Sequence, residues 1–518
     1  MIRSSMIYSG LTLVSRFMGL ARDLVITARL GASATPAADV YNTMLSFPNL
    51  FRRIFAEGAF AAAFVPAYAR TLKGQGEAEA DRIASDALAS LAAATILLTL
   101  AAQLAMPWLM YAINPGYADD PVKFKLAVTL TQISMPYLPC MAIGALLSGV
   151  LNARGRFIVS GAFPILLNIV MLAAVWPQTN PIAGAWASAW AVLAAGVLQA
   201  GVLWWGARKA GADIRLRWPR LTPEVKTLVA LAIPGAIAAS ATQINIFISS
   251  IMASFVPGGR SWLAVADRLY QLPLGLVGVA VGVALLPRLS QAVQAGDAEE
   301  AQTATDQAIV FSLALTLPAA AALSAMPFFL IDALFTRGEF TLVDARATAA
   351  ALLHYGWGVP AFVLARVLSP VFFARQDTKA PMRFALISVA VNIVLGLVLF
   401  QIIGIPGIAA ATSFAAWLTV VQMIATLARR GDYRPSKRAV SKVIRVALAS
   451  LLLGALLGLA SHFRPLIEDP LSILPFGSKE IAILAVCMVG GALYPVLLFA
   501  FGGVTPAEAK AVLRRRKT

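Results

Sequence analysis

Apolar runs long enough to cross a lipid bilayer recur from one end of this sequence to the other, and they restrict its fold more than any other feature. A helix of about 20 apolar residues spans the hydrocarbon core and satisfies its own backbone hydrogen bonds there. Only 13% of the 518 residues are charged and the mean hydropathy is +0.78, whereas soluble domains carry about 25% charged residues. The sequence therefore predicts an all-α polytopic membrane protein.

The apolar segments predict about 14 transmembrane helices. Several are longer than the bilayer requires, so we expect them to tilt, kink or protrude. Pro48 and Pro273 mark expected kinks in the second and eighth helices. The helices are expected near residues 5–30, 37–68, 82–112, 124–151, 157–176, 181–206, 227–256, 262–286, 303–334, 347–373, 384–402, 407–428, 443–460 and 481–503.

Positive charge concentrates in alternate connections between these helices. The basic clusters lie within residues 208–220, 429–438 and 514–517. Because Lys and Arg accumulate in cytoplasmic loops, this pattern predicts that both termini are cytoplasmic. It also accounts for most of the net charge of +17, so we expect no nucleic-acid partner. A site for anionic lipid headgroups in these loops is the alternative to a simple topology signal.

The chain contains an internal repeat with an offset of about 220–230 residues, which is typical of transporters. Ala38-Asp39-Val40-Tyr41 resembles Ala266-Asp267-Arg268-Leu269-Tyr270, and Ala153-Arg154 resembles Ala374-Arg375. Six helices in each half give both halves the same orientation, so the substrate site is expected between them. The repeat predicts an N-terminal six-helix lobe at 1–220, a C-terminal six-helix lobe at 221–432, and two additional helices with a basic tail at 433–518.

Charged residues also fall inside the predicted spans, where each costs at least about 2.5–3.5 kcal/mol at the bilayer centre. Such side chains must face water or one another. The cations outnumber the acids, so an anionic substrate would complete the set, and arginine binds phosphate oxygens in a bidentate manner. The cations are Arg16, Arg22, Arg29, Arg52, Arg53, Arg268 and Arg366, and the acids are Asp23, Asp39, Glu57 and Asp267.

The spacing of these charges allows a second interpretation, in which they are structural ion pairs. Arg53 and Glu57 are four residues apart and can pair on one helix. Arg16 and Asp23 are seven apart and share a face. Arg29 lies near a helix end, where its side chain can reach the interface. Binding of an anion and pairing within the protein therefore both remain open.

Catalytic and cofactor signatures are absent from the sequence. The two cysteines and two histidines form no metal-ligand spacing, and we find neither a Walker A sequence nor a strand-associated GxGxxG. No nucleophile–base pair stands out either. We expect a transporter that is not an enzyme and needs no cofactor.

Four segments of the chain carry a family resemblance. The longest comprises residues 47–60, FPNLFRRIFAEGAF, and continues to Pro66. Residues 15–23 (SRFMGLARD), 266–270 (ADRLY) and 375–379 (RQDTK) are shorter. Together these segments resemble those of the MurJ family of lipid II flippases. The resemblance covers essentially the whole chain and implies the MATE-like fold of the MOP exporter superfamily, with two six-helix lobes and two extra helices.

This resemblance implies outward flipping of lipid II, the undecaprenyl-pyrophosphate-linked precursor of peptidoglycan, across the bacterial inner membrane. It implies a cationic central cavity for the headgroup and a groove at the two extra helices for the lipid tail. Proteins of cell-wall synthesis become expected partners beside membrane lipids, and the coupling ion stays unknown. The family positions tied to the cavity or its gating match Ser15, Arg16, Arg22, Asp39, Asn49, Arg52, Glu57, Ser261, Asp267 and Arg268.

One position departs from the family pattern. Some relatives carry a glutamate where this chain has Gln271, which lies four residues after Asp267 and so on the same helix face. Any mechanism that needs a titratable acid there is in doubt, but an amide can still hydrogen-bond in a gate. Two other substrates remain open: another polyprenyl-linked saccharide, or a drug carried by a cation-coupled MATE-type exporter. A scaffold that transports nothing would have no use for costly buried charges.

Overall fold

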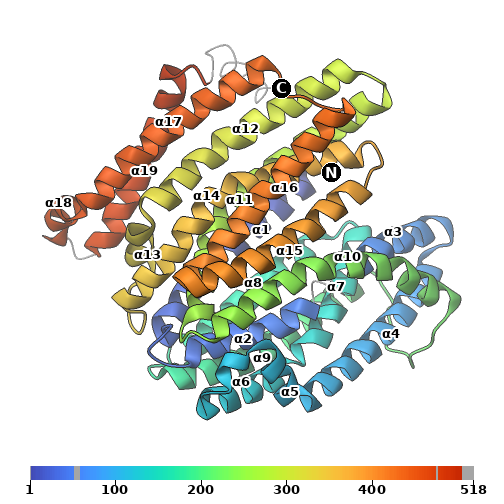
Figure 1. The fold of residues 1–518 in the computed structure, drawn as a ribbon. Helices are drawn as coiled ribbons and strands as arrows, with labels where there is room; N and C mark the ends of the chain where they lie inside the picture. The colour runs from blue at the N-terminus through green and yellow to red at the C-terminus, as the bar shows by residue number, and fades with distance from the viewer. Residues whose placement is uncertain (1, 52–58, 474–476, 504–518) are drawn as a thin grey trace. The chain divides into compact units, whose positions relative to one another are not determined.

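A computed structural model describes residues 2–51, 59–473 and 477–503, and within these ranges every regular element is a helix (Figure 1). The all-α prediction is therefore confirmed for the described chain. Contacts between residues divide the chain into two compact units. The first unit comprises Met1–Ser261 and Arg337–Thr341, and the second comprises Trp262–Thr336 and Leu342–Thr518.

In its described residues, the first unit consists of ten α-helices and one short 3-10 helix, together with the first residues of α11. They are α1 (Ile2–Leu30), α2 (Ala37–Phe51), α3 (Ala59–Gly74), α4 (Glu77–Leu104), α5 (Met106–Ile113), η2 (Pro115–Tyr117), α6 (Pro121–Ser134), α7 (Tyr137–Ala153), α8 (Phe157–Val175), α9 (Pro181–Lys209) and α10 (Pro223–Ser254).

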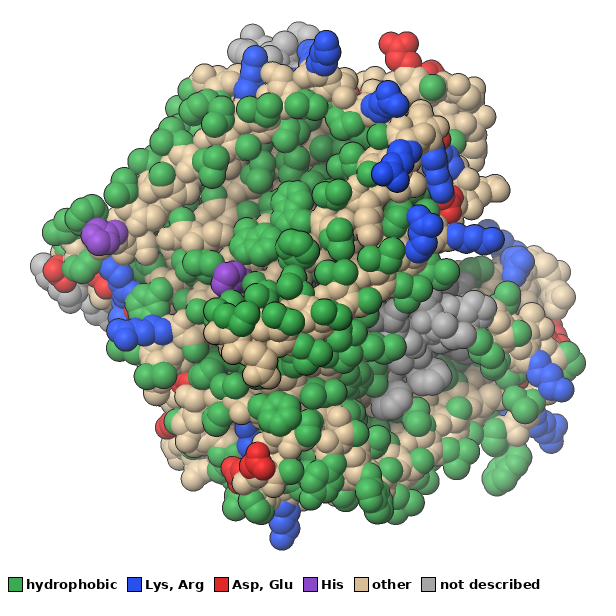
Figure 2. Space-filling model, viewed as in Figure 1, with side chains coloured by type: hydrophobic (Ala, Val, Ile, Leu, Met, Phe, Trp, Pro, Cys, Tyr) green, Lys and Arg blue, Asp and Glu red, His purple; other side chains and the backbone are tan. Residues whose placement is uncertain are grey.

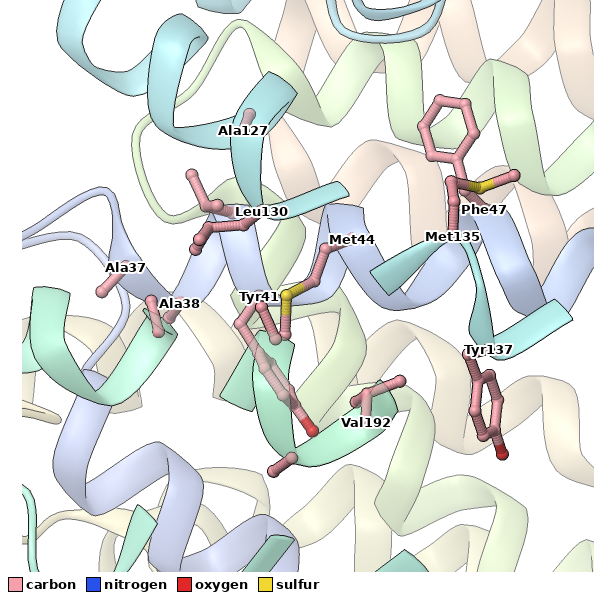
Figure 3. Packing of buried hydrophobic residues seen from close by; sticks show 14 of the residues in the cluster. Ala37, Ala38, Tyr41, Met44, Phe47, Ala127, Leu130, Met135, Tyr137 and Val192 are labelled. Carbon is pink, nitrogen blue, oxygen red and sulfur yellow. The ribbon is translucent and has the colours of Figure 1, made fainter. Parts of the chain in front are cut away.

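A hydrophobic core in the first unit fixes α2 against its neighbours. Tyr41, Met44 and Phe47 line one face of α2, and they pack with Leu130 of α6 and Val192 of α9 (Figure 3). These side chains are almost entirely buried. Because their spacing of three residues keeps them on one face of the helix, the opposite face of α2 stays available for polar contacts.

The second unit consists of longer helices followed by a hairpin-like pair. They are α11 (Gly259–Gln294), which begins in the first unit, α12 (Ala298–Ala325), α13 (Pro327–Phe335), α14 (Leu342–Phe373), α15 (Lys379–Ile403), α16 (Ile405–Arg430), α17 (Lys437–His462), α18 (Arg464–Glu468), η3 (Asp469–Ile473) and α19 (Ser478–Ala500).

Within the second unit, the helix pair α17 and α19 packs against α12 and α13 through small and branched apolar residues. Leu453 and Leu457 of α17 join Ile483 of α19 in one buried cluster with Met326 and Phe329. Further along, α17 lies against α12. The pair is thus attached along its length to α12 and α13.

Ten stretches of the described chain are long and apolar enough to cross a membrane. The other four predicted spans correspond to α1, α2 with α3, α10 and α11, so the predicted count of 14 is roughly consistent with the structure. Hydrophobic side chains cover much of the face seen in Figure 2. On α15 only 11% of the apolar stretch is buried inside the protein, as expected for a helix whose surface faces lipid.

Two arginines of the predicted repeat each hold a polar network within their own unit. Arg154 donates to both carboxylate oxygens of Asp81, at 2.9 and 3.0 Å, and to the hydroxyl of Tyr68 at 2.9 Å. Arg375 donates to Asp432 at 3.1 Å. The lobe boundaries at residues 220 and 432 concern the repeat itself and stay a prediction.

Candidate functional site

The first unit contains a fully buried carboxylate, that of Asp39, which lies in the first turn of α2. One oxygen accepts from Lys123 Nζ at 2.7 Å and from the backbone N–H of Gly258 at 2.9 Å. The other accepts from the hydroxyl and the backbone N–H of Ser261, at 2.9 and 3.2 Å. Four donors from two other parts of the chain therefore converge on one side chain.

Local sequence explains why these groups meet. Asp120 accepts from the backbone N–H groups of Val122 and Lys123 and so caps the start of α6. This places Lys123 in the first turn of α6, with its ammonium 4.2 Å from the centre of the Tyr117 ring. The ammonium therefore contacts a carboxylate and an aromatic face, both of which attract a cation.

Glycine is required at two close approaches around the connection between α10 and α11 (residues 255–258). Gly258 has φ of +79°, and a Cβ there would lie 2.9 Å from Ser33 Cβ. A Cβ on Gly116 would lie 2.5 Å from the carbonyl oxygen of Ser254. Only glycine allows the backbone to come this close, so the connection sits tightly against its neighbours.

A second set of polar contacts surrounds the first. Asn42, one turn after Asp39, donates to the hydroxyl of Ser261 at 3.2 Å. The buried Arg260 donates to Asn114 and, at 3.2 Å, to the hydroxyl of Ser46. The polar face of α2 is thereby bonded to the first turn of α11 at three positions, through Asp39, Asn42 and Ser46.

On α1, the predicted pair of Arg22 and Asp23 is present. The guanidinium of Arg22 is buried and donates to Asp23 Oδ1 at 3.0 and 2.7 Å. Arg16 is exposed on the same helix, and Ser15 is half-buried, its carbonyl accepting from Asn168 of α8 at 3.1 Å. Arg29 is half-buried in the last turn of α1.

In the second unit, Gln271 donates its amide to Asp267, so the two do share a face of α11. Arg268 lies between them in sequence and is exposed. Tyr270 packs its ring 4.7 Å from that of Tyr355 on α14. Arg366 is exposed on α14.

Several predicted site residues fall outside what can be described in full. Arg52, Arg53 and Glu57 lie outside the described residues, so the expected Arg53–Glu57 pair is not tested. Asn49, in the last turn of α2, is half-buried. Of the predicted residues in the first unit, the structure brings together Asp39 with Ser261, and Arg22 with Asp23.

Sequence reasoning missed Lys123 and Arg260, which supply the buried cations around Asp39 and Asn114. Both were assigned to loops because each lies just before a predicted span, at residues 124 and 262. The Asp120-Pro121 pair, a helix-capping signal three residues before Lys123, could have placed that lysine on α6. In this structure the cation beside Asp39 is thus a lysine from the edge of a predicted span.

The described residues contain no cluster of His, Cys, Asp or Glu that could hold a metal ion. Cys140 and Cys487 are free thiols. The arrangement in the first unit is instead a network of buried charges and amide donors that joins three segments of the chain.

Comparisons with known proteins agree over most of the chain. The family model described as "Lipid II flippase MurJ" matches residues 26–468. A relative from Rhizobium tropici, named "Probable lipid II flippase MurJ", is 40% identical and is aligned over 100% of this chain and 97% of its own length.

Solved structures show the same fold. A structure of "Lipid II flippase MurJ, inward closed conformation" matches with a TM-score of 0.78 at 22% identity, covering 96% of this chain and 98% of that one. An inward-facing multidrug resistance MATE family transporter of the MOP superfamily matches with a TM-score of 0.65 at 16% identity, covering 82% and 98%. The expected MATE-like architecture is thereby confirmed.

Proposed function

Because the chain belongs to the MurJ family of lipid II flippases, we propose that it moves lipid II from the cytoplasmic to the outer leaflet by alternating access. The observation that carries this proposal is the family match across the whole chain. An excess of arginine over acid within the predicted spans supports it, because the substrate carries a pyrophosphate.

The headgroup is proposed to bind in an arginine-rich cavity. Arginine suits this role because its charge is permanent and its planar fork matches phosphate oxygens. Serine and asparagine side chains add hydrogen bonds to the same group. The proposed substrate-binding residues are Arg16, Arg22, Arg52, Arg268, Asn49, Ser15 and Ser261, with Arg366 as a weaker candidate.

A second set of residues is proposed to control opening and closing. Their charges pair in one state and exchange partners in another, as expected for a two-state element. The contact between Asp267 and Gln271 and the four donors around Asp39 support this role. The proposed gating residues are Asp23, Asp39, Arg53, Glu57, Asp267 and Gln271.

The protein is a multi-pass membrane protein, and we assign it to the bacterial inner membrane with both termini in the cytoplasm. The basic connections support this orientation. Lipids contact its exposed apolar helices, and proteins of cell-wall synthesis are the proposed protein partners. The coupling ion stays open.

The test is transport by the purified protein in liposomes. Fluorescent lipid II is placed in one leaflet, and its appearance in the other is followed with a quencher that does not cross the membrane. Undecaprenyl-pyrophosphate bearing an unrelated saccharide and a cationic drug serve as rival substrates. Transport of lipid II well above both rivals supports the proposal, whereas preference for either rival replaces it.

A further inference from the structure

The buried Asp39 has a counter-ion that the arginine-based mechanism does not use. Lys123 is 7% exposed and Asp39 is 0% exposed, and their charged atoms lie 2.7 Å apart. The two residues are 84 positions apart in sequence. The pair therefore ties α6 to α2 across the fold of the first unit.

Removing either charge from such a pair leaves the other buried without compensation, which is strongly unfavourable. The carboxylate does more than neutralise the lysine, however. Its remaining lone pairs accept from Gly258 and Ser261, which belong to the α10–α11 connection and the first turn of α11. A carboxylate accepts these N–H and O–H donors more strongly when it is ionised.

We infer that Lys123 is a positioning residue for transport: its ammonium holds the carboxylate of Asp39 aimed at Gly258 and Ser261. In this way it holds the α10–α11 connection closed onto α2. This role rests on the proposed function, because it assigns to Asp39 a specific partner in gating. If both termini are cytoplasmic, the starts of α2 and α6 and the α10–α11 connection all lie on the outer side of the membrane.

The geometry of the lysine supports a fixed role. Its ammonium lies against the ring of Tyr117, whose hydroxyl is 3.0 Å from that of Thr43 on α2. Within the described chain, the carboxylate of Asp39 is the acid with which Lys123 forms an ion pair. Lys125, two residues later on the same helix, is exposed, and it forms a matched control with the same charge and stem.

The direct test measures hydrogen–deuterium exchange by mass spectrometry on peptides covering residues 255–262 of the full-length protein in nanodiscs. Replacing Lys123 by Met should raise exchange at Gly258 and Ser261 by about tenfold or more, as expected when a charge-assisted hydrogen bond is weakened. K125M should leave exchange unchanged. Unchanged exchange in K123M overturns the inference.

A second variant keeps the inference testable if K123M does not insert into the membrane. In D39N/K123M no buried charge is left uncompensated, so this protein should accumulate in the membrane. Its exchange at Gly258 and Ser261 should still exceed that of wild type, since an amide oxygen accepts more weakly than a carboxylate. Wild-type protection in the double variant also overturns the inference.

A variant in which the two charges are swapped distinguishes a positioning role of Lys123 from simple charge pairing. In D39K/K123D the ion pair is restored, but the side chain at position 39 can no longer accept from the two backbone N–H groups. We expect exchange to stay high and lipid II transport to stay low in this variant, while K123R recovers part of both. Full recovery by the swapped pair would reduce Lys123 to a structural counter-ion.

The exchange measurement and the transport measurement together distinguish this inference from the proposed function. Exchange is measured without substrate, so it reports on the Lys123–Asp39 contact even if the wild-type protein fails to move lipid II. Raised exchange in K123M with normal lipid II transport would overturn the positioning role. Raised exchange with transport reduced at least tenfold supports it.

Discussion

The guanidinium of Arg22 and the carboxylate of Asp23 neutralise each other on α1, yet only one oxygen of Asp23 accepts from the arginine. Both bonds come from the Nε and one Nη of the guanidinium. Because a guanidinium carries five N–H donors, a proposed bond from Arg22 to a phosphate oxygen need not replace its contact with Asp23.

We predict that replacing Arg22, Arg52 or Arg268 by Ala abolishes lipid II flipping while the protein still reaches the membrane. Replacement by Lys should restore only part of the activity, because it keeps the charge and loses the bidentate fork. Flipping in liposomes and protein level by immunoblot check this, with R429A in the last turn of α16 as control. Full activity of the triple Ala variant would exclude a pyrophosphate site at these residues.

At the scale of single residues, sequence reasoning identified Asp39 and Asp267 because a charge inside an apolar run has a clear cost, whereas Ser261 was implied only by the family resemblance. It missed Lys123 because a lysine at the edge of a run resembles an ordinary loop charge. Burial of such a residue depends on which segments fold against it, here α2 and the α10–α11 connection. No single-chain periodicity reveals that contact.

At the scale of helices, prolines explain where predicted spans were divided and where they were not. The breaks between α4 and α5, α6 and α7, and α12 and α13 fall next to Pro107, Pro136 and Pro327. A proline removes a backbone donor and disfavours the helical conformation of the preceding residue. Yet Pro48 and Pro318 lie inside continuous helices, because in a membrane bundle neighbouring groups can satisfy the freed carbonyl. Proline alone therefore does not predict where a helix ends.

The short helix α13 is joined to the α17–α19 pair by a buried acid. Asp332, 2% exposed, accepts from Arg464 of α18 and from Lys479 of α19, the latter at 3.1 Å. Burial raises the pKa of Asp332, but the hydrogen bonds from Arg464 and Lys479 lower it by more, so its pKa lies below the usual value. The ionised acid thus stabilises this end of the helix pair.

We predict that D332N lowers the thermal stability of the protein at neutral pH, at a cost of about 3 kcal/mol. Since the folded-state pKa is depressed, the contribution of Asp332 is complete above about pH 4 and is lost as the pH falls through its folded-state value. The difference in Tm between wild type and D332N should therefore shrink only below about pH 4. A difference that already vanishes at pH 6 would contradict the assignment, and E299Q, at an exposed position in the first turn of α12, serves as the control.

At the scale of the whole molecule, the apolar segments and the charge pattern predicted an all-helical membrane protein, and both the helical content and the MATE-like fold are confirmed. Periodicity succeeds here because lipid leaves the backbone no alternative to the helix. The arrangement of the polar contacts was not predictable in the same way. Arg154 and Arg375 have equivalent places in the predicted repeat, but one binds an acid on α4 and the other binds Asp432, just after α16.

We predict that both termini and the basic connections are cytoplasmic. A reporter that is active only in the cytoplasm should function when fused after Lys517 or inserted near Arg217. A reporter that is active only outside should function near Gly116. The reason is the concentration of Lys and Arg in alternate connections, and an outer location of Arg217 would reverse the orientation.

We predict that transport responds to the membrane potential and needs no ATP hydrolysis by this chain. Moving one charge through 100 mV is worth about 2.3 kcal/mol, so a pyrophosphate with roughly two charges gains at most about 4–5 kcal/mol. Arginines that move with the substrate would reduce this gain. Liposomes with an imposed potential and no nucleotide provide the measurement. Flipping that ignores the sign and size of the potential would refute electrical driving.

Two of the four donors to Asp39 are backbone N–H groups, those of Gly258 and Ser261. No point substitution other than proline deletes such a donor, whereas the length of the connection sets where both donors lie. Most substitutions in this segment should therefore preserve the contact as long as the length of the segment and Gly258 are kept. Insertions and deletions are the changes that evolution is expected to reject here, and a library of loop-length variants between α10 and α11 would be a more stringent probe of this contact than an alanine scan.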